Sequence, residues 1–198
     1  MVGCVLQSCQ LLPEVMLVPT PAKEASGDVA EVSPAKPPVI YNIKKGAHSA
    51  DFNPYKQVQL EHLRFAVTFD STAIYSTLDF GNQGDINKLY GLSDCSSDHH
   101  TNSARFGWRW YNGKLELHAY IYHNKVRTSV YIGNATLGQA TICEIRLEEE
   151  KYVFTASGKT VALPRSCIGV GAGYQLYPYF GGDETAPHDI SISIQELL

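Results

Sequence analysis

The dipeptide Asn112-Gly113 constrains the fold of this chain more than any other sequence feature. It separates residues 105–111 from residues 114–122, two stretches in which apolar and polar residues alternate. Alternation with a period of two indicates a strand with one buried face, and Asn-Gly between two such stretches indicates a type I′ hairpin. A two-residue turn fixes the register, so we expect Tyr111 opposite Lys114 and the remaining residues paired in sequence from there.

This hairpin should have one apolar and one polar face. A second turn at residues 123–124 leads into a third alternating stretch, residues 126–132, whose apolar residues fall on the same side as those of the hairpin. A shift of one residue would move every side chain to the opposite face, so the agreement of three strands supports the register. The expected polar face carries Arg105, Arg109, Glu116, His118, Tyr120, Arg127 and Tyr131.

Short strands and turns account for most of the remaining chain, and no stretch has the pattern of an amphipathic helix. Charged residues are only 18 %, while the chain has 12 Tyr and 16 Gly, a composition that suits strands and tight turns. We therefore predict an all-β fold, a two-sheet antiparallel β-sandwich of the jelly-roll type. Further strands are expected at residues 62–69, 73–78, 140–147, 151–156, 160–163, 174–180 and 189–195, with a long polar connection over residues 79–104.

The N-terminal part differs in composition from the rest. Residues 10–38 contain six of the ten prolines and show no periodicity, which predicts a flexible, disordered tether before a sandwich domain over residues 39–198. Residues 1–9 read MVGCVLQSC. Two interpretations stay open: the remnant of a lipoprotein signal with Cys9, or Cys4, as the lipidated residue, and an ordinary apolar N-terminus that lacks the basic and hydrophobic regions of a signal.

The charge argues against a nucleic-acid partner, and the hydrophobicity argues against a transmembrane span. The net charge is −4 and no basic stripe is present, so nucleic acid is not an expected partner. No stretch reaches the roughly 18 apolar residues needed for a transmembrane span.

The five cysteines do not form a zinc or redox motif, because no C-x-x-C is present. A disulfide between Cys143 and Cys167 is compatible with the sequence. The loop of residues 93–100 holds Cys95 and His99 four residues apart, with Asp94, Asp98 and His100 nearby, which suggests either a metal site or a polar turn. Asp183, Glu184 and Asp189 suggest either a calcium site or a charged turn before the last strand; apart from calcium, no cofactor is expected.

Guanidinium, imidazole and phenol groups on one sheet face indicate binding. Arginine can pair with carboxylate or sulfate, and tyrosine can stack on a sugar ring; Tyr177 and Tyr179 could line a glycan groove in the same way. The alternative is cross-strand pairing, such as Arg109 with Glu116. Glycoside hydrolysis needs two carboxylates, and this face offers only Glu116. A polysaccharide lyase needs a group that neutralises the uronate, a base and an acid, for which Arg105, His118 and Tyr120 are candidates.

Three stretches of the chain, residues 85–94, 102–110 and 177–189, resemble a poorly characterised family of exported bacterial domains. That family belongs with the concanavalin A-like jelly rolls, alongside lectins, laminin-G-like modules, glucanases and alginate-type lyases. The resemblance implies the fold and export from the cell but no activity. The R-x-E-x-R pattern of the lyases is not matched, because Gly107 stands where the acid is expected, and His118 follows Leu117 rather than a Gln-Ile pair.

The expected function is a non-catalytic carbohydrate-binding domain of a secreted or surface-anchored bacterial protein, with a glycan as its ligand. Two alternatives remain: a polysaccharide lyase-like enzyme that acts on an anionic glycan, and a structural or protein-interaction module.

Overall fold

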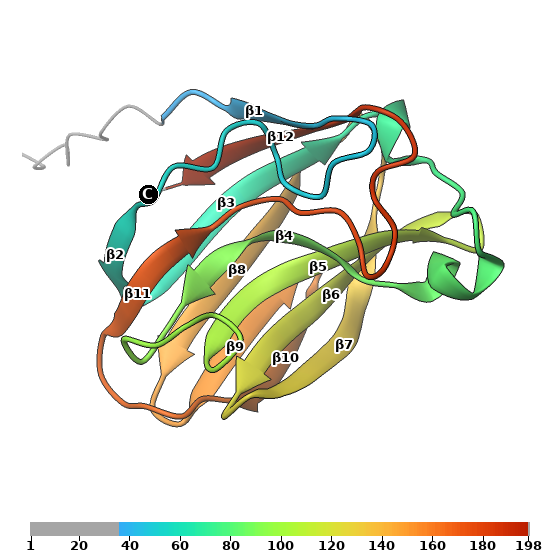
Figure 1. Cartoon of the computed structure of the whole chain (residues 1–198). Helices are drawn as coiled ribbons and strands as arrows, with labels where there is room; N and C mark the ends of the chain where they lie inside the picture. Colours follow the sequence, from blue (N-terminus) through green and yellow to red (C-terminus); the bar gives the residue numbers. More distant parts are fainter. Residues whose placement is uncertain (1–35, 198) are drawn as a thin grey trace, which may run out of the picture. The chain divides into compact units, whose positions relative to one another are not determined.

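The structure, a computed structural model, describes residues 36–197 (Figure 1). Two six-stranded sheets have the strand orders β1-β12-β3-β8-β9-β10 and β2-β11-β4-β5-β6-β7, and every pair of neighbouring strands is antiparallel. Residues 36–197 contain no α-helix, only the 3-10 turns η1 (Ser71–Ala73) and η2 (Phe80–Gly84). The strands are β1 (Val39–Ile43), β2 (Gln57–Leu60), β3 (His62–Phe69), β4 (Asn87–Ser93), β5 (Ser103–Tyr111), β6 (Lys114–His123), β7 (Val126–Ala135), β8 (Thr141–Glu148), β9 (Lys151–Ala156), β10 (Lys159–Pro164), β11 (Gly171–Leu176) and β12 (Ile190–Leu197).

The predicted hairpin is confirmed pair by pair. Tyr111 pairs with Lys114 and Arg105 with Tyr120, and both turn residues have positive φ, 50° at Asn112 and 69° at Gly113, as a type I′ turn requires. The next turn is formed by Asn124 and Lys125, one residue later than predicted. The register that this turn sets places Tyr131 opposite His118, and a bulge between Leu117 and His118 then shifts the pairing, so that Leu117 lies opposite Gly133.

Several other predictions of strands were wrong. The connection predicted at residues 79–104 contains β4, a central strand of its sheet, while residues 73–78 lie in the turn η1 and an irregular segment. The strand predicted at residues 174–180 ends at Leu176, so Pro178 lies outside β11, and β1 and β2 were not predicted. The segment from Phe52 to Lys56 is also irregular, and it leads into β2.

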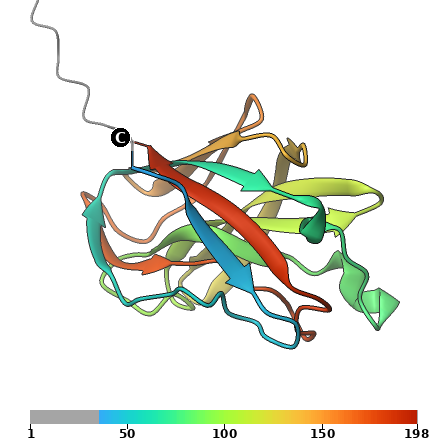
Figure 2. The same ribbon diagram turned by 90° about the horizontal axis from the view of Figure 1, so that it is seen from above.

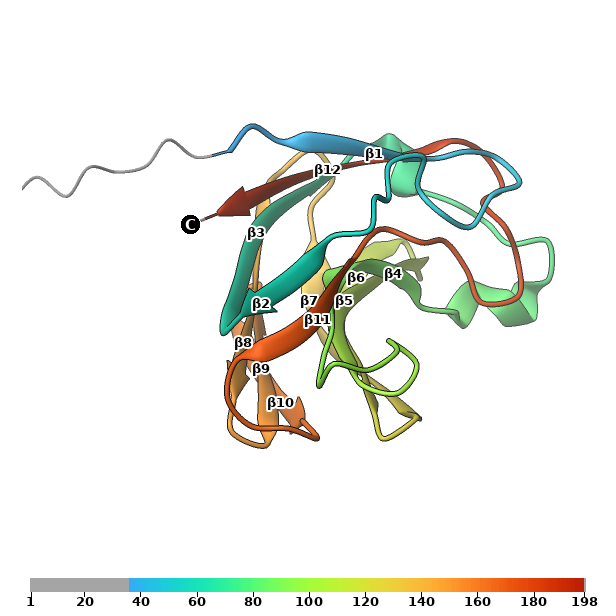
Figure 3. The ribbon, with the colours of Figure 1, turned by 60° about the vertical axis from the view of Figure 1, so that its left-hand side comes forward.

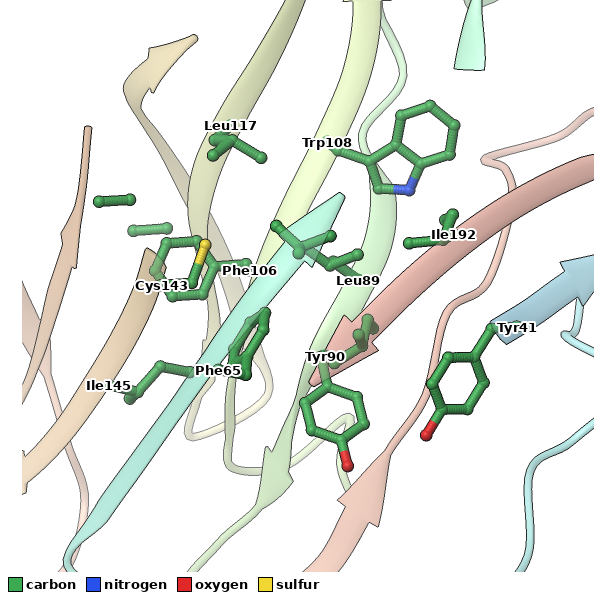
Figure 4. Close-up of a cluster of buried hydrophobic side chains, with 14 of the residues drawn as sticks. Tyr41, Phe65, Leu89, Tyr90, Phe106, Trp108, Leu117, Cys143, Ile145 and Ile192 are labelled. Carbon is green, nitrogen blue, oxygen red and sulfur yellow. The ribbon is translucent and has the colours of Figure 1, made fainter. Parts of the chain in front are cut away.

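Apolar side chains from both sheets fill the space between them (Figure 4). Phe65 of β3 packs edge-on against Phe106 of β5 with ring centroids 5.8 Å apart, and Trp108 of the same strand packs against Phe69. All four of these side chains are fully buried. Burial of an aromatic side chain of this size stabilises the fold by about 1.5–3 kcal/mol, so these contacts fix the inner face of β5. Its outer face is thereby fixed as well.

The layers and the connecting segments define where the outer face of the second sheet lies. Seen from above, β1 and β12 run side by side in the first sheet (Figure 2). Figure 3 shows η2 and the connection between β4 and β5 on the side of β4–β6 that faces away from β8–β10. These segments therefore flank the face on which the sequence predicted the polar side chains.

The predicted signal remnant, including Cys9, and most of the predicted linker lie outside the described residues. Within the described residues, the first strand begins at Val39. Among the described residues, no helix has the length and hydrophobicity needed to cross a bilayer.

Candidate functional site

Arg105 is the most unusual polar residue of the outer face. It lies in the middle of the second sheet, on β5, and its side chain is only 6 % exposed. Its Nε atom is buried and has no hydrogen-bond partner among the described residues. The guanidinium carbon lies 5.6 Å from the centre of the Tyr120 ring. Burial lowers the pKa of Arg105 to about 10, because a charge removed from water without a partner is unfavourable.

Arg105 lies against a cavity of about 260 Å³. The side chains around the cavity are basic or aromatic, and none of the lining residues carries a carboxylate. Its lining consists of Lys88, His99, His100, Arg105, Tyr120, Tyr122, Arg127, Tyr179 and Gly182, which we refer to as the cationic pocket. A cavity with this lining favours an anion.

Lys88 forms a second wall of the cationic pocket. It comes from β4, and its ammonium donates a hydrogen bond to the carbonyl of Gly181. The Nζ atom lies 5.8 Å from the ring centre of Tyr120 and 5.7 Å from that of Tyr179. Burial, together with the positive charges of Arg105 and Arg127, lowers the pKa of Lys88 to about 8, although Asp85 opposes this shift. A negative charge in the pocket would therefore raise the pKa of Lys88.

The two histidines come from the segment between β4 and β5. His99 Nδ1 lies 2.8 Å from the hydroxyl oxygen of Tyr174, and the amide of His100 donates a hydrogen bond of 2.8 Å to Asp98. Burial, aided by the charges of His100 and Arg105, lowers the pKa of His99 against the opposing charge of Asp98. A neutral imidazole at this position can accept a proton.

A disulfide between Cys95 and Cys167 fixes the base of this segment. The predicted pairing of Cys143 with Cys167 was wrong, because Cys143 is a free, buried thiol on β8 in the opposite sheet. The metal site suggested for Cys95 and His99 is also contradicted, since the sulfur of Cys95 is bonded to another sulfur. His99 and His100 reach the cationic pocket instead.

Four of the predicted face residues form a separate cluster on the same face. Arg109 Nε donates a hydrogen bond of 2.7 Å to Glu116, and its Nη1 donates one of 2.6 Å to the carbonyl of Gly84. His118 Nε2 lies 3.3 Å from the same carboxylate, and the Tyr131 hydroxyl bonds to Asn134. Burial lowers the pKa of His118, although Glu116 opposes the shift. This cluster has the cross-strand pairing that was the alternative to ligand binding, because the guanidinium of Arg109 pairs with Glu116 on the neighbouring strand.

Solved structures with a similar arrangement of strands include alginate lyase AlyC3, with a TM-score of 0.51 and 11 % sequence identity over 79 % of this chain and 72 % of that chain. The fold is a jelly-roll β-sandwich. Lower scores relate the chain to a β-1,3-1,4-glucanase (lichenase) derived from a mouse hindgut metagenome (0.47; 10 % identity; 80 % of this chain and 79 % of that chain) and to the carbohydrate-binding module CBM66 from Bacillus subtilis (0.36; 8 %; 78 % and 82 %). No protein-family model and no curated protein matches the sequence.

Within this jelly roll, the predicted ligand residues divide between the two locations. Arg105, Tyr120 and Arg127 lie in the cationic pocket, and so does Tyr179, whose ring also stacks on that of His48 with ring centroids 5.1 Å apart. Lys88 was missed because its strand was assigned to a connection. The adjacent histidines were noticed in the sequence, but only as metal ligands. Tyr177, the other predicted groove tyrosine, lines a different cleft.

The three carboxylates of the predicted calcium site are not gathered into one group. Glu184 accepts hydrogen bonds of 2.8 Å from the amides of Leu78 and Asp79. Asp189 accepts a hydrogen bond of 2.9 Å from the amide of Lys45 and pairs with Lys44. Among the described residues, the one group with suitably close ligand atoms consists of Asp94 and the two disulfide cysteines. These three carboxylates therefore do not offer a shared set of calcium ligands.

Proposed function

We propose that this domain binds an anionic polysaccharide in the cationic pocket, with a carboxylate or sulfate group of the ligand placed against Arg105. The observation that carries the proposal is the burial of Arg105, 6 % exposed, with its Nε unpartnered among the described residues. Removing one charge from water without a partner is costly, and an arrangement of this kind is expected where a ligand supplies the partner.

The remainder of the pocket suits a sugar that carries such a group. Tyr120, Tyr122 and Tyr179 offer ring faces and hydroxyl groups, the combination by which tyrosine binds a ring that is apolar on its faces and polar at its edges. Lys88 and Arg127 add positive charge around the same space. A negatively charged polysaccharide would thus meet several cations and no carboxylate among the residues that line the pocket.

A second candidate function is a polysaccharide lyase, which one observation favours. The predicted base, His118, belongs to the Arg109–Glu116 cluster, but His99, His100 and Tyr122 line the cationic pocket with Arg105. In such an elimination, a base removes the proton from the carbon next to the uronate carboxylate. The C–O bond to the neighbouring sugar breaks, an acid protonates the departing oxygen, and a C=C bond forms. A lowered pKa at His99 suits the base.

The disulfide supports export of the domain. Disulfides such as Cys95–Cys167 form and persist in oxidising compartments, outside the cell or in the periplasm. We propose an extracellular, cell-surface or periplasmic location, with lipidation of Cys9 as one means of anchoring.

Binding is tested by isothermal titration calorimetry with a polyuronate, a sulfated polysaccharide and a neutral glucan. The wild type should bind at least one of the charged polymers, and Arg105→Met should abolish that binding. Arg146→Met is the matched control, because Arg146 is a half-exposed arginine of β8 in the opposite sheet that pairs with Glu144 and Glu148. Binding to none of the charged polymers would overturn the proposal and favour the third expectation, a structural or protein-interaction module.

Catalysis is tested with the same polymers. A lyase produces an unsaturated uronate, whose conjugated C=C bond and carboxylate absorb in the ultraviolet. If this absorbance increases with the wild type but not with His99→Ala or Arg105→Met, the domain is a lyase. Binding without new absorbance would establish a binding domain alone.

A further inference from the structure

A second cleft, distinct from the cationic pocket, has a volume of about 370 Å³. It lies between β1 and β12 of one sheet and β4 of the other, and the irregular segments of residues 52–56 and 36–38 complete it. Its walls are largely apolar and aromatic. They are formed by Lys36, Pro37, Val39, Tyr41, Phe52, Pro54, Lys56, Tyr90, Tyr177, Ile194 and Glu196, which we refer to as the aromatic cleft.

Four rings line the aromatic cleft at distances typical of aromatic packing. The centroid of Tyr41 lies 6.2 Å from those of Phe52 and Tyr90, and 5.8 Å from that of Tyr177. Tyr41 and Tyr90 are buried, and their side chains lie side by side (Figure 4). Phe52 is 52 % exposed, although it packs against the buried ring of Tyr41. An exposed phenylalanine beside a concave aromatic wall leaves ring surface for an apolar guest.

Among the described residues, the charged groups that line the aromatic cleft are two ammonium groups and one carboxylate, a net positive charge. Glu196 accepts hydrogen bonds from Lys36 at 2.6 Å, Lys56 at 3.1 Å and the Tyr90 hydroxyl at 2.7 Å. Burial opposes ionisation of Glu196, but these hydrogen bonds outweigh it and lower its pKa to about 2. Two ammonium groups therefore share one carboxylate. Each ammonium has three donors and uses one of them on Glu196, so donors remain for another anion.

We infer that the aromatic cleft binds an aromatic carboxylate, with its ring against Phe52, Tyr41 and Tyr177 and its carboxylate on Lys36 and Lys56. The charge decides the class of ligand. A cation would be repelled by the excess ammonium, and a neutral aromatic compound would form no ion pair with it. This inference is independent of the proposed function, because none of these residues lines the cationic pocket.

The test uses the full chain with labelled isoleucine methyl groups, because Ile194 lines the cleft and reports binding there. The probes are 2-naphthoate, the uncharged 2-naphthylmethanol and the non-aromatic cyclohexanecarboxylate. We expect 2-naphthoate to shift the Ile194 methyl signal in a saturable manner and each of the other probes to bind about tenfold more weakly. No shift with 2-naphthoate, or equal affinity for 2-naphthylmethanol, would overturn the inference.

Two variants with partly exposed side chains locate the contacts without disturbing the core. Lys56→Gln should weaken 2-naphthoate about tenfold, the order expected for a charge-assisted hydrogen bond, and leave 2-naphthylmethanol unchanged. Phe52→Ser should weaken both. Lys151→Gln is the matched control, since Lys151 is a similarly exposed lysine paired with Glu148. Arg105→Met should leave the response of Ile194 intact, and affinity unchanged in both Lys56→Gln and Phe52→Ser would overturn the inference.

Discussion

Asp94 and Arg165 form an ion pair in which both side chains are 0 % exposed, with 2.7 Å between Oδ2 and Nε. The same carboxylate accepts hydrogen bonds from the Tyr152 hydroxyl at 2.9 Å and the amide of Ala172 at 3.0 Å. The pair joins the end of β4 to the segment that precedes β11, beside the Cys95–Cys167 disulfide. It therefore holds the base of the segment that carries His99 and His100.

Replacing Arg165 by methionine should destabilise the domain severely. Asp94 would then keep a buried charge without its cation, which typically costs about 3–5 kcal/mol. The free energy of unfolding, measured with urea, should fall by that amount. The control Arg146→Met removes a half-exposed arginine and should change it by less than about 1 kcal/mol. Equal losses in the two variants would contradict the structural role assigned to the buried pair.

Cys143 should be unreactive in the folded protein. It is completely buried, and burial raises the pKa of its thiol well above the ordinary value, so the nucleophilic thiolate is scarce. Iodoacetamide followed by peptide mass spectrometry should find the Cys143 peptide unmodified in the native protein and modified after denaturation. Cys95 and Cys167 should be modified only after reduction. Rapid labelling of native Cys143 would contradict its burial.

The sequence predicted the sandwich best where local patterns agree with tertiary burial. Asn112-Gly113 specifies the turn, and β5 and β6 alternate throughout. In β4, by contrast, Leu89 and Tyr90 are adjacent and both buried, because the pairing with β5 shifts between Lys88 and Gly91. Strict alternation therefore cannot identify this strand. The strand predicted at residues 73–78 does not form. Ala73 belongs to the turn η1, at the start of which the Asp70 carboxylate accepts a hydrogen bond from the amide of Thr72.

The candidate site was predictable only in part for a similar reason. Strand alternation placed Arg105, Tyr120 and Arg127 on one face, because the register of the strands alone decides on which face a side chain lies. The register also set Arg109 opposite Glu116, the pair that the alternative interpretation named. The sequence could not show that the Nε of Arg105 has no hydrogen-bond partner among the described residues, because this depends on how the segments outside the hairpin pack around it. The positions of His99 and His100 depend on the Cys95–Cys167 disulfide, whose pairing is a property of the folded chain.

Arg105→Met should stabilise the protein while it abolishes anion binding. The substitution removes a buried charge that has no ion-pair partner in the described part of the chain, and it retains most of the apolar volume. We therefore expect the free energy of unfolding to rise by about 1 kcal/mol despite the loss of the contact with Tyr120. Urea denaturation without ligand measures this gain. Arg109→Met should have the opposite effect, because it leaves Glu116 without its guanidinium partner. A loss of stability in Arg105→Met would show that Arg105 serves the fold.

Lys88 should make stability and ligand binding depend on pH in the alkaline range. Its pKa is about 8 in the folded protein and 10.5 ordinarily, so between these values the unfolded chain binds the additional proton. Stability should therefore rise with pH across this window as far as Lys88 contributes, and its penalty should be fully present below about pH 8. Tyr120, which faces the ammonium, has its pKa raised to about 12 by burial and keeps its proton in this window.

An anion in the cationic pocket should raise the pKa of Lys88, since it offsets the burial and the charges of Arg105 and Arg127 that lower it. Binding of a polyuronate near pH 9 should then be accompanied by proton uptake. Calorimetry in two buffers with different ionisation enthalpies measures the number of protons taken up. The uptake at pH 9 should disappear in Lys88→Met. Binding at pH 9 without proton uptake would mean that the anion lies away from Lys88.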